Sequence, residues 1–303
     1  MAKKVDLSII ILNFNTKDLL RDCLQSVLKS EKNSFQYETI VVDNASTDGS
    51  VAMIKKAFSW VKLIESKVNL GFSGGNNLGL KIARGRYILF LNSDTKVKPD
   101  AFKKMITFMD KNPKVGAATA KTMLVSGGMD PDCHRSFPTP WPSISYFLGL
   151  EKLFPKSKTF GQYHKFYLDL NKVHEIDAGF GTFMFVRREV INQVGPWDDQ
   201  YFFYGEDLDY FYRIKQAGWQ VMFYPEPFLV HYKGASSGLR KESEKISPAS
   251  RQTRIKTAKA SIKAMEIFYQ KFYRDKYPHW LTWLVIFGIK LKGFFRILHH
   301  YLK

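Results

Sequence analysis

The stretch LSIIILNFN, residues 7–15, decides the fold. Leu7 to Leu12 are nearly all apolar and rich in β-branched side chains, which is typical of a short strand covered on both faces. From Thr16 to Lys29 the apolar residues recur with a helical period, so we expect a helix to follow the strand directly. A doubly covered strand followed by a helix is the repeating unit of an α/β fold.

The same alternation of strand and helix continues along the chain. Buried runs predict strands at 39–42, 61–65 and 87–91, with helices at 50–58, 76–83 and 99–110. Further β-type runs occupy 176–187, 220–224 and 228–231, and a helix follows the acidic cluster within 201–218. We therefore predict a mostly parallel sheet flanked by helices, whose ligands bind beyond the carboxyl ends of the strands.

The composition of the 303 residues excludes several classes of protein. Hydrophobic residues make up 45% of the chain, which is ample for a buried core and excludes a disordered protein. The two cysteines, Cys23 and Cys133, provide neither a disulfide framework nor metal-ligand spacing, which is typical of a reducing cytosol. The first residues lead into a strand instead of a signal peptide, and no apolar run reaches the roughly 18 residues of a membrane span.

The basic residues are concentrated at the C-terminal end. The formal net charge is +18, and residues 232–303 alone hold 16 Lys or Arg and 4 Asp or Glu. Basic and apolar residues interleave from 250 to 276, and a ten-residue apolar run at 280–289 is followed by further basic and aromatic residues. This pattern predicts amphipathic helices that lie on an anionic membrane surface. The alternative is a helical pair that covers the domain or joins two copies of the chain.

Polar side chains follow three of the predicted strands at their carboxyl ends. They are Asn13 and Asn15, Asp43 and Asn44, and Asn92 and Asp94. A carboxylate such as Asp94 can ligate a divalent cation that neutralises a diphosphate, and Asp43 can accept hydrogen bonds from a base or a ribose. Each is also a residue type that favours turns or caps helices, and Asp48 could cap the helix after Asp43 instead.

Three further motifs carry candidate chemistry. Gly71 and Gly75, with Asn76, belong to a glycine-rich segment that we expect to be a loop, where the backbone approaches a ligand and the next helix start binds an anion. Adjacent Glu206 and Asp207 raise each other's pKa and can supply a general base, although acidic residues also stabilise a helix start. His231 ends an apolar run and is either a metal ligand or a structural histidine.

These motifs, in this order, resemble the family 2 glycosyltransferases with the GT-A fold, and the rhamnosyltransferase-like branch in particular. The resemblance covers about Asp6 to Ser236. The matching stretches are IIILNFN (9–15), VVDNASTDGS (41–50), NLGFSGGNN (69–77), LNSD (91–94), GPWDD (195–199), FYGEDLD (203–209) and HYKGAS (231–236).

The resemblance implies an inverting transfer of a sugar from a dTDP- or UDP-linked donor to a hydroxyl of a lipid-linked glycan, in cell-surface polysaccharide assembly. It implies that Asp207, with Glu206 sharing or orienting the role, is the general base. Asp94 and His231 would hold Mg²⁺ or Mn²⁺. The donor-binding residues would be Asn13, Asn15, Asp43, Asn44, Gly71, Gly75, Asn76, Asn92 and Asp94.

One position departs from the family pattern. Asn92 stands where the family's DxD motif begins with an aspartate, so one anionic ligand is missing. We expect metal binding to depend on Asp94, His231 and the donor's own phosphates.

Two regions are expected along the chain, with a division between residues 236 and 237. Residues 1–236 would form the glycosyltransferase domain, in which the proline- and aromatic-rich stretch 130–171 is either a cover over the sheet or a flap on the acceptor side. Residues 237–303 would form the basic amphipathic region that binds membrane or a second copy. The enzyme would then be cytoplasmic and associate peripherally with the inner face of the cell membrane.

Two other classes of function remain as alternatives. A nucleotide-sugar-binding subunit without catalysis would keep the same strand-end motifs. A nucleic-acid-binding protein would also be basic, but none of the standard base-reading signatures occurs in the sequence, so we expect no nucleic-acid partner.

Overall fold

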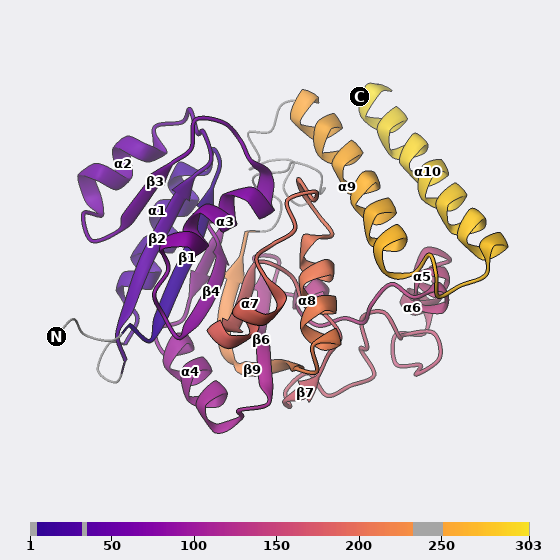
Figure 1. The fold of residues 1–303 in the computed structure, drawn as a ribbon, viewed down its shortest axis with the longest axis horizontal. Helices are drawn as coiled ribbons and strands as arrows, with labels where there is room; N and C mark the ends of the chain where they lie inside the picture. Colours follow the sequence, from indigo (N-terminus) through magenta and orange to yellow (C-terminus); the bar gives the residue numbers. More distant parts are fainter. Residues whose placement is uncertain (1–4, 32–34, 233–250, 303) are drawn as a thin grey trace.

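The computed structural model describes residues 5–31, 35–232 and 251–302 (Figure 1). The division expected at residue 236 and the last four residues of the motif at 231–236 lie outside the described residues.

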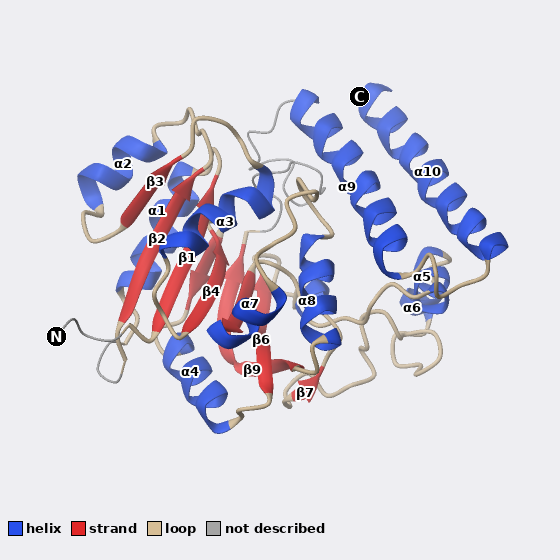
Figure 2. Ribbon diagram, in the orientation of Figure 1, coloured by secondary structure: helices blue, strands red, loops and turns tan. Residues whose placement is uncertain are grey.

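A single sheet of nine strands forms the centre of the described chain (Figure 2). Its order is β3-β2-β1-β4-β8-β6-β9-β5, and β7 pairs with β9 off this path. Pairing is parallel from β3 to β4, whereas β8 runs antiparallel to both of its neighbours, β4 and β6. The strands are β1 (Leu7–Asn13), β2 (Tyr37–Asp43), β3 (Lys62–Glu65), β4 (Tyr87–Asn92), β5 (Thr95–Val97), β6 (Val115–Leu124), β7 (His174–Glu175), β8 (Phe183–Arg187) and β9 (Gln220–His231).

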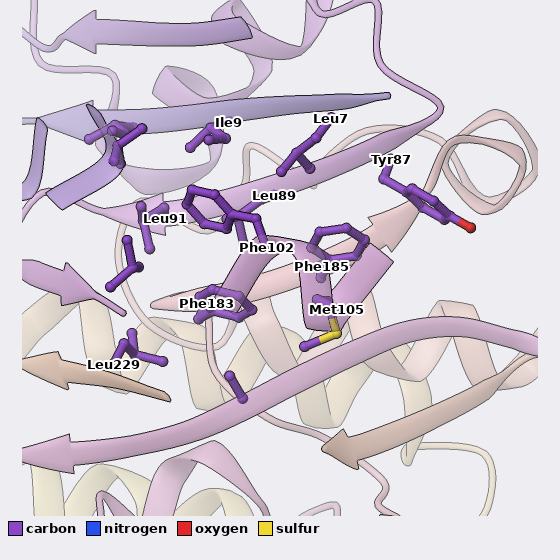
Figure 3. Close-up of a cluster of buried hydrophobic side chains, with 14 of the residues drawn as sticks. Leu7, Ile9, Tyr87, Leu89, Leu91, Phe102, Met105, Phe183, Phe185 and Leu229 are labelled. Atoms are coloured by element: carbon purple, nitrogen blue, oxygen red, sulfur yellow. The ribbon is translucent and has the colours of Figure 1, made fainter. Parts of the chain in front are cut away.

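Helices cover both faces of the sheet, which confirms the predicted fold class. α1 (Lys17–Leu28), α2 (Ser50–Ala57) and α4 (Ala101–Lys111) cover one face, and α3 (Gly71–Ile82), α7 (Arg188–Val194) and α8 (Glu206–Gln216) cover the other. Successive side chains of a strand point to opposite faces. Ile9 of β1 accordingly packs in the core shown in Figure 3, whereas its neighbour Ile10 packs in the core on the opposite face.

The structure corrects the prediction that residues 69–75 form a glycine-rich loop. The glycines belong to the first turns of α3, which begins at Gly71 and not at Asn76. A β-carbon on Gly75 would lie 2.3 Å from Leu12 Cδ1, and one on Gly71 would lie 2.2 Å from the carbonyl oxygen of Phe202. The glycines are therefore required by the close packing of α3 on β1 and on the chain at Phe202.

Three strands, β5, β6 and the two-residue β7, were not predicted, and two predicted runs form one strand. β6 consists largely of small residues with little strand signal, and β5 has only three residues. The runs at 220–224 and 228–231 join as β9, with a register shift opposite Ala120 and Lys121 of β6. The run expected from Ile176 is a strand only from Phe183 to Arg187.

The C-terminal region is helical, as its pattern predicted. α9 (Arg251–Phe272) and α10 (His279–Leu302) lie side by side at the edge of the molecule (Figure 1). Tyr212 of α8 packs against Phe268 and Phe272 of α9, so an aromatic cluster attaches α9 to the domain. The stretch 130–171 forms three short helices, η1 (Pro131–Cys133), α5 (Pro140–Phe147) and α6 (Leu150–Leu153), and Figure 1 shows α5 and α6 at the lower ends of α9 and α10.

The packing of α3 predicts a difference between two glycines with positive φ. Gly71 (φ 73) faces the Phe202 backbone, whereas Gly218 (φ 85) has open space around its Cα. We expect Gly218→Ala to lower the free energy of unfolding by roughly 1–2 kcal/mol through backbone strain alone. Gly71→Ala should lower it by about 2 kcal/mol more, because the new methyl group also forces the chains apart. Urea denaturation measures both, and equal losses would contradict the packing role of Gly71.

Candidate active site

The register of the parallel strands brings the predicted strand-end residues to one edge of the sheet. Asn13 lies opposite Asp43 in the pairing of β1 with β2, and Leu12 lies opposite Asn92 in the pairing of β1 with β4. Thr16 links these ends, because its hydroxyl donates to Asn13 Oδ1 at 2.7 Å and contacts Ser93 Oγ at 2.8 Å. The structure therefore brings together the first three motifs.

Asp43 is buried in a network of short hydrogen bonds. Its Oδ2 accepts from Asn13 Nδ2 at 2.9 Å, and its Oδ1 accepts from the Ser46 backbone N–H at 2.9 Å. Asn15, which has a positive φ of 53°, accepts from the Thr47 N–H at 2.8 Å. Gly49 is the N-cap residue of α2, and Asp48 before it accepts from the N–H groups of Lys17 and Ser50, the first residues of α1 and α2. Asp43 is therefore not a helix cap, and its carboxylate is fixed at the sheet edge.

Asn44 and Asn76 have local structural roles. Asn44 Nδ2 donates to Gly71 O at 3.0 Å and its Oδ1 accepts from the Leu70 N–H, while Asn76 Nδ2 donates to Phe72 O. The N–H groups of residues 70–72 at the start of α3 all donate to protein oxygens. The expectation that this helix start binds an anion is therefore wrong for these three groups.

Asp94 and His231 lie in contact, as the metal prediction requires. The antiparallel pairing of β5 with β9 places Thr95 opposite His231, and His231 Nε2 lies 3.3 Å from Asp94 Oδ1. On the other side of the ring, Nδ1 lies 3.2 Å from Asp130 Oδ2. Burial alone would lower the pKa of His231, but the two carboxylates outweigh it and raise the pKa to about 9.

The side chains of Asp94 and His231 provide only part of the ligand set that a divalent cation needs. A carboxylate oxygen and an imidazole nitrogen suit Mn²⁺ or Mg²⁺-like ions, and a carboxylate on the second ring nitrogen is the usual way to orient a metal-binding histidine. Over the described ranges, however, no group of three or more His, Cys, Asp or Glu side chains could hold a metal ion. The Asn92 side chain is bound to Thr182 instead of to Asp94 or His231, because its Nδ2 donates to Thr182 Oγ1 at 3.1 Å.

Glu206 and Asp207 begin α8 and face a buried arginine that the sequence did not reveal. Arg135 Nη2 lies 2.6 Å from Asp207 Oδ2, and Arg135 Nε donates to Gly179 O at 3.0 Å. Burial raises the pKa of Asp207, and the positive charge of Arg135 opposes that rise. Burial and the charge of Asp207 raise the pKa of Glu206 well above its usual range. Burial thus favours the protonated form of both carboxyls, and Arg135 stabilises the ionised form of Asp207 more directly, because it contacts that carboxylate.

Arg135 belongs to a chain of buried charges in the stretch 130–171. Asp132 Oδ1 lies 3.8 Å from Arg135 Nη1 and 3.8 Å from His164 Nε2, and Glu151 Oε2 lies 2.9 Å from His164 Nδ1. Asp130, on the same short segment as Arg135, contacts His231. One segment therefore contacts both a predicted metal ligand, His231, and the predicted base, Asp207, and only its charged residues could have signalled this in the sequence.

The third carboxylate of the acidic cluster has a different role. Asp209 accepts from Arg213 Nε at 2.6 Å and from Lys271 Nζ of α9 at 2.6 Å. It attaches α9 to α8 and does not join the Glu206–Asp207 pair.

Residues 8–195 match the family described as Glycosyl transferase family 2. The chain is 33% identical over 165 residues to a poly(ribitol-phosphate) beta-glucosyltransferase of Bacillus spizizenii, covering 50% of this chain but only 25% of that protein. It is 25% identical over 229 residues to an N-acetylglucosaminyl-diphospho-decaprenol L-rhamnosyltransferase of Mycobacterium tuberculosis, covering 66% of this chain and 67% of that one.

Two solved structures share the fold. GalNAc-T7 with UDP, GalNAc and Mn²⁺ superposes with a TM-score of 0.59 at 16% identity, covering 88% of this chain and 48% of that one. TarS of S. aureus superposes with a TM-score of 0.53 at 15% identity, covering 90% of this chain and 45% of that one. These likenesses confirm the predicted GT-A fold.

The Arg135–Asp207 pair predicts a pH-dependent loss of stability. In Arg135→Met the buried Asp207 loses its counter-charge, so its folded-state pKa rises further above the unfolded value. A raised folded-state pKa removes stability as the pH rises through it, so the deficit should grow from about pH 5 to about pH 7.5, towards roughly 3–5 kcal/mol.

Urea denaturation at both pH values measures this deficit, with Arg213→Met as the matched control, because Asp209 keeps Lys271 as a partner. Adding Asp207→Asn to Arg135→Met should recover part of the loss at the higher pH. A deficit of equal size at both pH values would contradict the role of Arg135 as counter-charge to Asp207.

Proposed function

Since this chain belongs to the family 2 glycosyltransferases, we propose that it transfers a sugar from a nucleotide-diphosphate sugar to a hydroxyl of a glycan acceptor. The observation that carries the proposal is that Asp43, the Asp94–His231 pair and Asp207 are connected through the ends of β1, β2 and β9 and the segment 130–135. Asp43 would bind the base or ribose of the donor, and the Asp94–His231 pair would hold the cation at its diphosphate. Asp207 would act on the acceptor hydroxyl.

In this proposal the donor lies against the carboxyl ends of β1, β2 and β4. Asp43, held by Asn13, is oriented to accept hydrogen bonds from the base or ribose of a UDP or dTDP sugar. Asn15 and Asn44 shape the two loops beside it. The contribution of Gly71, Gly75 and Asn76 to donor binding would be indirect. They allow or stabilise the close packing of α3 on β1, and α3 holds the Asn44 side chain in place through Gly71 O.

Asp94 and His231 would hold Mg²⁺ or Mn²⁺ together with the donor phosphates, and Asn92 would lie at the margin of this site. When bound, the cation would neutralise the departing diphosphate. His231 must lose its proton to become a ligand, and Asp130 keeps its ring oriented through Nδ1. A GT-A structure that contains UDP and Mn²⁺ supports this part of the proposal by fold likeness.

Asp207 would act as the general base, and the reaction would invert the anomeric carbon by a single displacement. Its carboxylate takes the acceptor's proton while the hydroxyl oxygen attacks the sugar and the nucleotide diphosphate leaves. Arg135 positions this carboxylate and favours its ionised form. Glu206 is buried beside it, and its Oε2 has no hydrogen-bond partner among the described residues. Glu206 would therefore orient the acceptor or share its proton.

The acceptor would be a lipid-linked glycan of the cell envelope. The names of the two relatives state that one glucosylates poly(ribitol-phosphate) and that the other transfers L-rhamnose to N-acetylglucosaminyl-diphospho-decaprenol, which supports this part of the proposal. The stretch 130–171 would lie on the acceptor side, and residues 237–303 would associate with the inner face of the membrane. Over the described ranges, no helix is both long and apolar enough to cross a membrane.

We expect Asp207→Asn to reduce turnover by roughly 10²–10⁴-fold, because the amide cannot accept the acceptor's proton. Donor affinity should stay within about threefold, because the donor does not depend on this carboxylate. Single-turnover transfer and donor binding by calorimetry measure the two effects, with the exposed Asp199→Asn as control. Undiminished turnover would reject Asp207 as the base, and donor binding without turnover in the wild type would favour a non-catalytic subunit.

We expect Asp94→Ala to remove the cation-dependent part of donor binding. In the wild type, Mn²⁺ with a UDP or dTDP sugar should raise the melting temperature more than the same sugar with a chelator, in proportion to ln(1 + [L]/Kd). Thermal shift over a panel of nucleotide-sugars also identifies the donor. Asp100→Ala, which removes a surface partner of Lys104, is the control. An unchanged Mn²⁺ dependence in Asp94→Ala would reject the metal role.

A further inference from the structure

α10 carries an apolar stripe along its outer side. Trp280, Trp283, Phe287, Leu291, Phe294 and Leu298 follow one another at spacings of three or four residues, and all are exposed. Residues at this spacing lie on one face of a helix. The opposite face packs on α9, where a β-carbon on Gly293 would lie 2.5 Å from Ile262 Cδ1. The stripe is therefore not the face that attaches α10 to the protein.

A second group of exposed apolar side chains comes from a distant part of the sequence. The group comprises Trp141, Ile144, Phe147, Leu148, Leu153 and Phe154, all in or next to α5 and α6. Leu148 and Leu153 are 68% and 69% exposed. Monomeric soluble proteins rarely expose contiguous apolar patches of this kind unless they serve an interaction.

The two groups meet at one contact. Lys292 of α10 lies over the ring of Phe147, with Nζ 3.9 Å from the ring centroid. The exposed rims of α5–α6 and α10 are thus neighbours, although about 140 positions of sequence separate them. We name the two groups together the apolar rim.

The charge around the apolar rim identifies its occupant. α10 contains Lys290, Lys292 and Arg296 and no acidic residue. A second copy of the chain on the same surface would bring these positive charges together, which is unfavourable. An anionic bilayer offers the opposite charge and a boundary in which Trp and Phe side chains are stabilised.

We propose that the apolar rim, formed by α5–α6 and α10 together, docks on an anionic phospholipid bilayer. This deepens the membrane part of the proposed function, because it adds α5 and α6 to the C-terminal helices. The stretch 130–171, which includes α5 and α6, also contains Arg135, the residue that contacts Asp207. This stretch therefore connects the proposed base, through Arg135, with the surface that would meet a lipid-linked acceptor.

The test is co-sedimentation of the full chain with vesicles, either of phosphatidylcholine alone or with about 30% phosphatidylglycerol. The wild type should bind the anionic vesicles, and weakly the neutral ones. Phe147→Ser/Leu148→Ser and Trp283→Ser/Phe287→Ser should each weaken binding by roughly tenfold. Lys290→Glu should weaken binding to anionic vesicles only. Trp60→Ser/Val68→Ser, which removes exposed apolar side chains near β3, is the matched control and should bind as the wild type.

Each variant is first compared with the wild type by circular dichroism and melting temperature, because only folded variants are informative. Since these side chains are exposed, we expect the fold to survive, and Lys290→Glu tests the same surface without removing an apolar group. If only the α10 variants lose binding, the composite rim is wrong. Unchanged vesicle binding together with a dimer that these variants dissociate would instead assign the surface to a second copy. Asp207→Asn should bind vesicles normally, so failure of the transferase proposal would leave this result unaffected.

Discussion

The register of β1 between β2 and β4 is the constraint on which the candidate site depends. Asn13 meets Asp43 and Leu12 meets Asn92 because both neighbours pair with β1 in parallel. A shift of one residue would turn every side chain of β1 to the other face and break the hydrogen bond between Asn13 and Asp43. The two separate cores hold this register, because Ile9 and Ile10 each have a different apolar environment to fill.

The segment 130–135 extends that constraint to the rest of the site. Its Asp130 contacts His231, and its Arg135 contacts Asp207. Two backbone hydrogen bonds between Arg135 and Ala178 attach the segment to the domain. The Glu151–His164–Asp132 chain continues from Arg135 into α6. Buried charges of this kind are costly unless each has a partner, so the fold of the stretch 130–171 and the ionisation of Asp207 depend on each other.

The sequence predicted the first half of the fold well because those strands are short, apolar and followed at once by helices. It failed where the signal was steric or long-range. The glycines of residues 71–75 resemble a loop in the sequence, yet they lie in α3. They are glycines because Leu12 and Phe202 leave no room for larger side chains. β6 was missed because small residues pack it between its neighbours. Arg135 could not be paired with Asp207 because 72 positions separate them and no local pattern connects them.

The concentration of positive charge at the C-terminal end could not be interpreted until its residues were placed. Cations at the C-terminal end of α9 and just beyond it attach this helix to the domain: Lys271 of α9 binds Asp198 and Asp209, and Lys276, which follows the helix, lies over the ring of Tyr212. On α10, by contrast, Lys290 is exposed beside the apolar stripe, and the helix meets the rest of the chain through α9 and the ring of Phe147. For residues 237–303 the sequence leaves two alternatives open, helices that cover the domain and helices that face an external partner. α9 has the first arrangement and α10 the second, so the proposed membrane contact concerns the outer helix.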